Sequence, residues 1–573
     1  MPMQRFCFLM CFILCRSLLL AQSPSLQWAR NFSGTSTSTT ANGIAIANDD
    51  SGNVYTTGWF QQTVDFDPGP NTYPLSADPT QSNMFVSKLD ASGHFIWAKR
   101  IGGPAQCVGL SIAVDMNGNV YTTGFFNGQV DFDPGTAVQN STSSGGENIF
   151  ILKLSPSGNL KWVKTIGNTN LNKGKSIQVD ALGNSYTAGM FMLTTDFDPG
   201  PGVHNLVNLG NQDAFVLKLD SLGNFIWARN FGGNTTYTDA MAMALDPSGH
   251  LYTTGSFQSM VDFDPGPATF NLTAAGDHDV FVAKWDTSGN LVWASRLGGT
   301  GIEYGRGIDV DTFGNVLTSG FFYDMADFDP GINTYNLTPN GADDIFISKL
   351  NSNGNFIWAK SIGGPSWDEC YSLALDDTGN VYTTGFYNGT VDFDPGPGIF
   401  NQSTLNVYSH LFITKLNTAG DFVWAKNMGS NSATTTAYSV CVDQHNEIYA
   451  TGFFGGTADC DPDIPVQNLV SGGMYDILVL KLGSSASVGL AEDNYELPFS
   501  LFPNPGSGTF TINGSNAISG LKLYNSFGQL INSQNTFNGN TARADISNYP
   551  SGVYFIEWQD GQQTGRCKWV LTK

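Results

Sequence analysis

The sequence contains few charged residues, and basic ones are especially scarce. Asp, Glu, Lys and Arg make up 13% of the 573 residues, whereas an ordinary soluble domain carries roughly 25%. With 26 Lys and Arg against 49 Asp and Glu, the formal net charge is −23. Proteins that bind nucleic acid need clustered Lys and Arg to neutralise phosphates. We therefore expect no nucleic-acid partner.

Long apolar runs are confined to the start of the chain. Residues 1–21 combine Arg5, an apolar run and Ala21 before a plausible cleavage point, which is the pattern of a secretory signal peptide. No later stretch approaches the roughly 18 apolar residues of a membrane-spanning helix. We expect an exported chain whose mature form has no transmembrane segment.

Cysteines are few, and catalytic signatures are missing. The five cysteines beyond residue 21 fit neither a disulfide framework nor a zinc site. Cys441 and Cys460 could pair within one repeat, although two free thiols are the favoured interpretation. No G-x-S-x-G elbow, H-E-x-x-H motif or phosphate-binding loop occurs, and the six histidines are scattered. An enzyme is therefore the less favoured class.

What the sequence does contain is one unit repeated seven times. The string VDFDPG begins at residue 64, and its first aspartate recurs at spacings of 65 to 67 residues. A second series resembles GNVYTTGWF at residues 52–60. A third series places a tryptophan once per unit, at Trp28, Trp97, Trp162, Trp227, Trp293, Trp358 and Trp424. Three interleaved series of this kind indicate a repeat protein.

Each unit is predicted to form four β-strands. In the second unit they are residues 111–115, 119–126, 148–154 and 160–167, joined by turns rich in Gly, Asn and Ser. Four-stranded sheets repeated radially make a propeller. The seventh unit ends at Leu482 without a Trp-bearing fourth strand, and residues 26–32 supply one surplus strand of that type. The predicted fold is all-β: a seven-bladed β-propeller over residues 26–483, its last blade closed by the N-terminal strand.

The repeat resembles the SBBP (seven-bladed β-propeller) family, whose units carry a D-x-x-G-N-V-Y-x-T-G core followed by an F-V-x-K-L strand. The resemblance implies architecture rather than activity, because one fold hosts many functions.

A different β-rich segment follows a predicted linker at residues 484–498. Its landmarks are Pro503-Asn504-Pro505, Gly508, Tyr524-Asn525, Gly528, the run Tyr549–Tyr554 and the terminal stretch Lys568–Lys573. Residues 499–573 resemble the type A C-terminal sorting domain of the type IX secretion system. The resemblance implies a small β-sandwich read by the type IX export machinery of a Gram-negative bacterium. It also implies removal of the domain, with the passenger released or attached to the cell surface.

The VDFDPG strings allow two interpretations. Two carboxylates spaced two residues apart in extended chain point the same way, and such pairs could bind Ca²⁺ through oxygen ligands. The candidate metal ligands are Asp65, Asp67, Asp131, Asp133, Asp262, Asp264, Asp392 and Asp394. The favoured interpretation is that Asp caps a turn bent by Pro-Gly, so no cofactor is required.

Two further series also favour structural roles. A lysine recurs in every third strand and could form a cationic ring for an anionic ligand, but pairing with nearby Asp is favoured because buried charges need partners. The Trp series could stack on sugars, but packing between blades is favoured.

These observations favour a secreted or surface-attached binding protein that recognises an extracellular glycan or protein. The alternative is an extracellular polysaccharide lyase or hydrolase with its site over the central channel. Antiparallel alternation places the VDFDPG connections and the interblade segments at one end of every blade, and recognition residues concentrate on such long loops. The predicted ligand contacts on this face are Tyr304, Arg306, Trp367, Asp368 and Glu369.

Overall fold

The computed structural model describes residues 23–483 and 500–571, except for short gaps at 235, 405–406, 431, 464–465, 504–505, 514–516, 526–529, 532–533 and 561–562. The predicted signal peptide and linker lie outside the described residues. All regular elements in the described residues are β-strands, and no helix there is long and apolar enough to cross a membrane. Two compact units, Met1–Ala486 and Ser487–Lys573, divide the chain.

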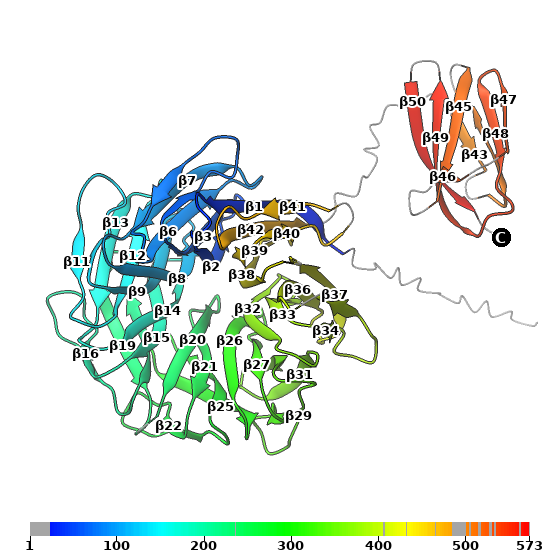
Figure 1. Cartoon of the computed structure of the whole chain (residues 1–573). Coiled ribbons are helices and arrows are strands. Elements are labelled where there is room, and N and C mark those ends of the chain that lie inside the picture. Colours follow the sequence, from blue (N-terminus) through cyan, green and yellow to red (C-terminus); the bar gives the residue numbers. More distant parts are fainter. Residues whose placement is uncertain are drawn as a thin grey trace, which may run out of the picture. The chain divides into compact units, whose positions relative to one another are not determined.

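The first unit contains seven antiparallel sheets with the same four-strand order (Figure 1). The innermost strands are β2 (Ala41–Asn48), β8 (Gln106–Val114), β14 (Asn172–Val179), β20 (Thr238–Leu245), β26 (Glu303–Val310), β32 (Glu369–Leu375) and β38 (Thr435–Val442). The second strands are β3 (Val54–Phe60), β9 (Val120–Asn127), β15 (Ser185–Phe191), β21 (Leu251–Phe257), β27 (Val316–Phe322), β33 (Val381–Tyr387) and β39 (Ile448–Phe454).

The outer half of each sheet is equally regular. The third strands are β6 (Asn83–Leu89), β12 (Asn148–Leu154), β18 (Asp213–Leu219), β24 (Asp279–Trp285), β30 (Asp344–Leu350), β36 (His410–Leu416) and β42 (Asp476–Gly483). The outermost strands are β7 (Phe95–Ile101), β13 (Leu160–Ile166), β19 (Phe225–Phe231), β25 (Leu291–Gly299), β31 (Phe356–Ile362), β37 (Phe422–Met428) and β1 (Ser25–Gly34).

The N-terminal strand completes the last sheet. β1 pairs antiparallel with β42, with Trp28 opposite Lys481. The sequence predicts this position for the N-terminal strand. Each innermost strand packs against the innermost strand of the next sheet, and β38 packs against β2. The Ile46 amide donates to Ser439 Oγ at 3.4 Å across that junction. The result is a propeller-like arrangement of sheets around a shared centre.

Each VDFDPG string forms a two-stranded ribbon beside its sheet. In the first, β4 (Thr63–Asp65) pairs with β5 (Pro74–Ser76) and also with β1 of the last sheet. The central Phe66 is fully buried, and its ring lies 5.1 Å from that of Phe32. Because that phenylalanine packs into the core, the ribbon is fixed to the sheets rather than free in solvent.

The second unit consists of two four-stranded sheets around one core. One sheet has the order β43 (Ser500–Phe502), β44 (Thr509–Asn513), β48 (Thr541–Asp545), β47 (Gln534–Asn538), and the other β46 (Leu530–Ile531), β45 (Ile518–Tyr524), β49 (Gly552–Asp560), β50 (Gln563–Leu571).

In the first unit, Cys441 and Cys460 are free thiols, as are Cys107 and Cys370.

Candidate functional site

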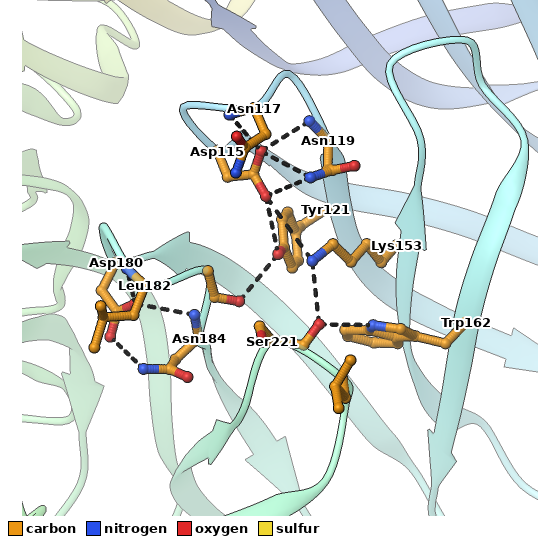
Figure 2. Close-up of polar contacts among 12 residues, drawn as sticks. Asp115, Asn117, Asn119, Tyr121, Lys153, Trp162, Asp180, Leu182, Asn184 and Ser221 are labelled. Atoms are coloured by element: carbon orange, nitrogen blue, oxygen red, sulfur yellow. Dashed lines mark hydrogen bonds and ion pairs between the residues drawn. The ribbon is translucent and has the colours of Figure 1, made fainter.

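The short turns at one end of the sheets are filled by a repeated polar network (Figure 2). Asp115 accepts hydrogen bonds from the backbone and side chain of Asn119 and, at 3.2 Å, from the Tyr121 hydroxyl. Lys153 lies 3.9 Å from Asp115 and donates to the Ser221 carbonyl of the next sheet. The polar residues of the D-x-x-G-N-x-Y string therefore stabilise the turn, and their polar groups form hydrogen bonds with one another.

The lysine series takes the structural role. Five of its members pair with a carboxylate of their own sheet, at distances from 3.0 to 3.9 Å. The remaining two, Lys218 and Lys284, lie over the rings of Tyr186 and Tyr252. The prediction of pairing is confirmed for the five, and the series forms no unpaired cationic ring.

The tryptophan series joins neighbouring sheets. The indole N–H donates at 3.0 to 3.2 Å to a turn carbonyl of the next sheet at Trp28, Trp97, Trp162, Trp293 and Trp358. The turn glycine of that sheet lies against the ring, as Gly158 does against Trp97. The packing interpretation is confirmed for these five residues.

The VDFDPG carboxylates hold turns. Asp131 accepts from the amides of Asp133 and Gln139, and Asp133 accepts from the amide of Gly135. The same pattern recurs at Asp65 and Asp67, at Asp262 and Asp264, and at Asp392 and Asp394. Among the described residues, no group of three or more His, Cys, Asp or Glu is arranged to hold a metal. Ca²⁺ binding by these pairs stays a prediction.

A feature that the sequence analysis did not find occurs in every innermost strand. The register against the second strand shifts by one residue, which leaves one residue of each strand as a β-bulge. A bulge re-aims the side chain of its extra residue. The seven bulge residues, which we call the bulge ring, are Ile44, Leu110, Lys175, Met241, Arg306, Tyr371 and Tyr438. All are half-buried.

The glycine of each YTTG string explains the position of the bulge. A Cβ on Gly320 would lie 1.8 Å from the carbonyl oxygen of Tyr304, two residues before the bulge. The corresponding distance is between 1.8 and 2.0 Å at all seven of these glycines. The bulged backbone thus occupies the volume that any side chain would need, and glycine is required at this position.

Bulge residues of successive sheets contact one another. Lys175 Nζ lies 2.6 Å from Asp239 and 3.2 Å from the Met241 sulfur. The rings of Tyr371 and Tyr438 lie 5.2 Å apart. The ring therefore has a lysine paired with a carboxylate on one side and two adjacent tyrosines on the other.

Arg306 lies at the centre of the aromatic side. Its guanidinium carbon is 5.5 Å from the ring of Tyr304, 5.6 Å from that of Phe321 and 6.0 Å from that of Tyr371. Its buried Nε has no hydrogen-bond partner, and no ion pair joins it to any described carboxylate. We call Tyr304, Arg306, Phe321, Glu369, Tyr371 and Tyr438 the axial cluster.

Buried carboxyl groups adjoin this cluster. Burial raises the pKa of Glu369, although the Tyr371 hydroxyl and the Arg306 charge oppose that shift. Asp343 is 1% exposed, neither of its carboxylate oxygens has a hydrogen-bond partner, and burial together with the Glu369 charge raises its pKa to about 7. A carboxyl group that titrates near neutral pH, as Asp343 does, is consistent with either polar recognition or acid–base chemistry.

A cavity of about 420 Å³ is lined by the residues that follow the bulge in every innermost strand. Aliphatic side chains alternate there with polar ones, namely Asn48, Gln178, Asp309 and four serines, and Arg306 also contributes to the lining. Arg306 thus belongs to both the cavity and the axial cluster. The volume falls within the range of small-molecule sites.

Three of the five predicted contact residues come together in the axial cluster: Tyr304, Arg306 and Glu369. Trp367 is 60% exposed and lines a separate shallow pocket with Ser366 and Asn388. Asp368 is fully buried and accepts from the amides of Gly364 and Asn388. Asp368 lies just before β32, and both of its carboxylate oxygens are occupied by backbone amides rather than presented to the axial cluster. Tyr371, Tyr438 and Lys175 were missed.

Comparison with known proteins identifies the second unit. Residues 500–572 match the family "Secretion system C-terminal sorting domain". This is the type IX sorting domain, and it indicates export of the chain to the medium or the cell surface. The predicted partnership with the secretion machinery has the same support.

The first unit has more distant relatives. An uncharacterized WD repeat-containing protein of Acanthamoeba polyphaga mimivirus is 23% identical over 494 residues, which cover 72% of this chain and 35% of that protein. The Regulatory protein FlaEY of Caulobacter vibrioides is 28% identical over 127 residues, or 22% of this chain and 13% of that protein. The chain thus spans about a third or less of these relatives. The WD-repeat similarity agrees with a propeller-like repeat protein.

Solved structures add little. A gluconolactonase from Xanthomonas campestris aligns with 66% of this chain and 98% of its own, at 11% identity and a TM-score of 0.26. A structure solved to explain Dscam isoform specificity aligns at 8% identity and a TM-score of 0.10, covering 57% of this chain and 96% of its own. Scores of this size carry no argument about function.

Proposed function

We propose that the chain is an exported binding protein of a Gram-negative bacterium. In it, residues 26–483 form a closed seven-bladed β-propeller and residues 499–573 direct type IX secretion. The propeller recognises an extracellular glycan or protein at the axial cluster. The pairing of β1 with β42 and the packing of β38 on β2 support closure of the ring.

One observation carries the placement of the binding site. Turn aspartates, tyrosines, lysines, tryptophans and glycines recur from sheet to sheet and fulfil structural contacts. The bulge position, by contrast, changes from Ile and Leu to Lys, Met, Arg and Tyr around the ring. A β-bulge that recurs in every sheet but presents different side chains around one centre is suited to recognition of one asymmetric ligand.

The alternative function is an extracellular polysaccharide lyase or hydrolase, and a specific observation favours it. Glu369, Tyr371 and Arg306 bring a carboxyl group, a phenol and a cation together beside the channel. General acid–base catalysis needs such a titratable pair. Binding remains the leading proposal because burial, together with the Glu369 charge, raises the pKa of the Tyr371 hydroxyl and makes it a poorer acid–base group.

The test is a glycan array probed with the full chain, with and without Ca²⁺. We expect binding to a restricted set of glycans that Tyr371→Ala and Tyr438→Ala abolish. Tyr335→Ala is the matched control, because Tyr335 also stacks on a phenylalanine, at 4.8 Å, but in an outer ribbon. Equal binding by all three variants would refute the axial site, and shortening of the bound glycans would establish the enzyme alternative.

A further inference from the structure

Arg306 is exceptional among the arginines of the first unit. Of the five that the structure describes there, four donate hydrogen bonds to protein oxygens: Arg30 to Gly93, Arg100 to Asn83, Arg229 to Ser288 and Arg296 to Asp279. Arg306 donates to none among the described residues, and its Nε is sealed from solvent. A buried N–H donor without an acceptor costs free energy, which a ligand that supplied the acceptor would offset.

The shortage of partners is specific to this position, because carboxylates are in excess over the whole chain. Lys175, the other cation of the bulge ring, is neutralised by Asp239 at 2.6 Å. The nearby Glu369 forms no ion pair with Arg306 among the described residues, and the Tyr371 hydroxyl opposes the rise in the pKa of Glu369 that burial causes. Three aromatic rings hold the Arg306 guanidinium, so that its position is set before any ligand arrives.

The surroundings of Arg306 indicate what kind of group a bound anion would belong to. The Tyr371 and Tyr438 rings lie 5.2 Å apart at an interplanar angle of 38°, and both side chains are half-buried. Aromatic surfaces of this kind accept the C–H face of a sugar ring, while a guanidinium matches a carboxylate through two parallel hydrogen bonds.

We propose that the axial cluster binds an acidic glycan, with the carboxylate of a uronic-acid residue on Arg306 and its sugar ring against Tyr371 and Tyr438. This inference rests on the proposed binding function and names its ligand class. A sulfate ester offers the same charge, but its tetrahedral group does not match the planar two-pronged arrangement as a carboxylate does.

The test uses calorimetric titration of the full chain with trisaccharides of galacturonate, glucuronate and mannuronate, each beside its carboxyl-reduced and sulfated counterparts. We expect one uronate trisaccharide to bind about tenfold or more tightly than its reduced form. Arg306→Met should remove that preference, and Arg306→Lys should retain part of it. Arg229→Met is the matched control, because Arg229 also lies over an aromatic ring, that of Trp227, at 5.7 Å.

Different results would overturn different parts of the proposal. Equal affinity for acidic and reduced forms would overturn the acidic-glycan assignment and leave glycan binding intact. Tighter binding of the sulfated form would replace carboxylate by sulfate. Unchanged affinity in folded Arg306→Met, checked by its melting curve, would overturn the role of Arg306. If no trisaccharide binds while the array detects a glycan lost in Tyr371→Ala, only the ligand class fails.

Discussion

Single glycines decide where the axial side chains point. The glycine that ends each YTTG string leaves room for the carbonyl of the bulged strand, and the bulge in turn aims one side chain toward the centre. Because these glycines have no Cβ, the bulged backbone can pack against them, and the sequence thereby sets the backbone geometry of the proposed binding site.

Gly320→Ala tests that connection. The new Cβ would meet the Tyr304 carbonyl oxygen at 1.8 Å, so the bulge at Arg306 must shift. We expect a loss of about 1–3 kcal/mol in the free energy of unfolding, measured by urea denaturation. Gly103→Ala, whose Cβ would have no neighbour nearer than 3.4 Å, should change stability by less than about 0.5 kcal/mol. Equal effects of the two substitutions would contradict the account.

Buried carboxyl groups give the protein a predictable pH dependence. Burial raises the pKa of Glu303 to about 8 and that of Asp343 to about 7, above the values near 4 of an unfolded chain. The folded state therefore binds these protons more tightly, and stability falls as pH rises from the unfolded pKa through the folded one. We expect a fall of at least about 1 kcal/mol between about pH 5 and pH 8, reduced in Glu303→Gln. A flat profile in denaturant titrations would contradict this.

The outer ribbons are elements whose carboxylates act through hydrogen bonds. Asn keeps the acceptor oxygen of Asp but not its charge, so Asp131→Asn combined with Asp133→Asn should preserve the turn and change stability by less than about 1 kcal/mol. EDTA should shift the melting temperature only slightly. A loss of more than about 15 °C on adding EDTA would show that the ribbons are Ca²⁺ sites.

Strand β1 is the element on which closure depends. A chain that starts after Gly34 would leave β42 with an unpaired edge and remove the buried Trp28 and Phe32. We expect this chain to aggregate or to lose several kcal/mol of stability, whereas a chain that starts at Ser25 should melt as the mature protein does. Identical melting curves would refute closure by the N-terminal strand.

The sequence predicts those elements whose residues recur at a fixed spacing. The residues that form the strands and turns, and the lysine and tryptophan series, recur at equivalent positions in every unit. The bulge ring escaped prediction because its seven positions carry six different residue types, so a search for repetition passes over it. The burial of Asp368 against the amides of Gly364 and Asn388 could not be predicted, because the sequence does not show which loop side chains turn inward. The signal that was present is a variable residue between two small ones, as in Gly305-Arg306-Gly307 and Cys370-Tyr371-Ser372.

At the scale of the whole molecule, the two units have different roles. The sorting domain of residues 500–572 indicates export, and the repeat unit is the part to which we assign the proposed binding function. Turn aspartates, most of the lysines and most of the tryptophans of the repeat make contacts within the fold. The binding role that we propose would therefore fall to the few side chains that do not repeat.

Hydroxyl-radical footprinting tests the central claim most directly. The exported chain would be labelled with and without the glycan that the array identifies, and side-chain oxidation measured by mass spectrometry. The account predicts protection of Tyr371 and Tyr438, with no change at Met116, Leu182 and Leu222, which are 77%, 80% and 70% exposed on the short turns. Protection of those three side chains with Tyr371 and Tyr438 unchanged would place the ligand on the opposite face and contradict the account.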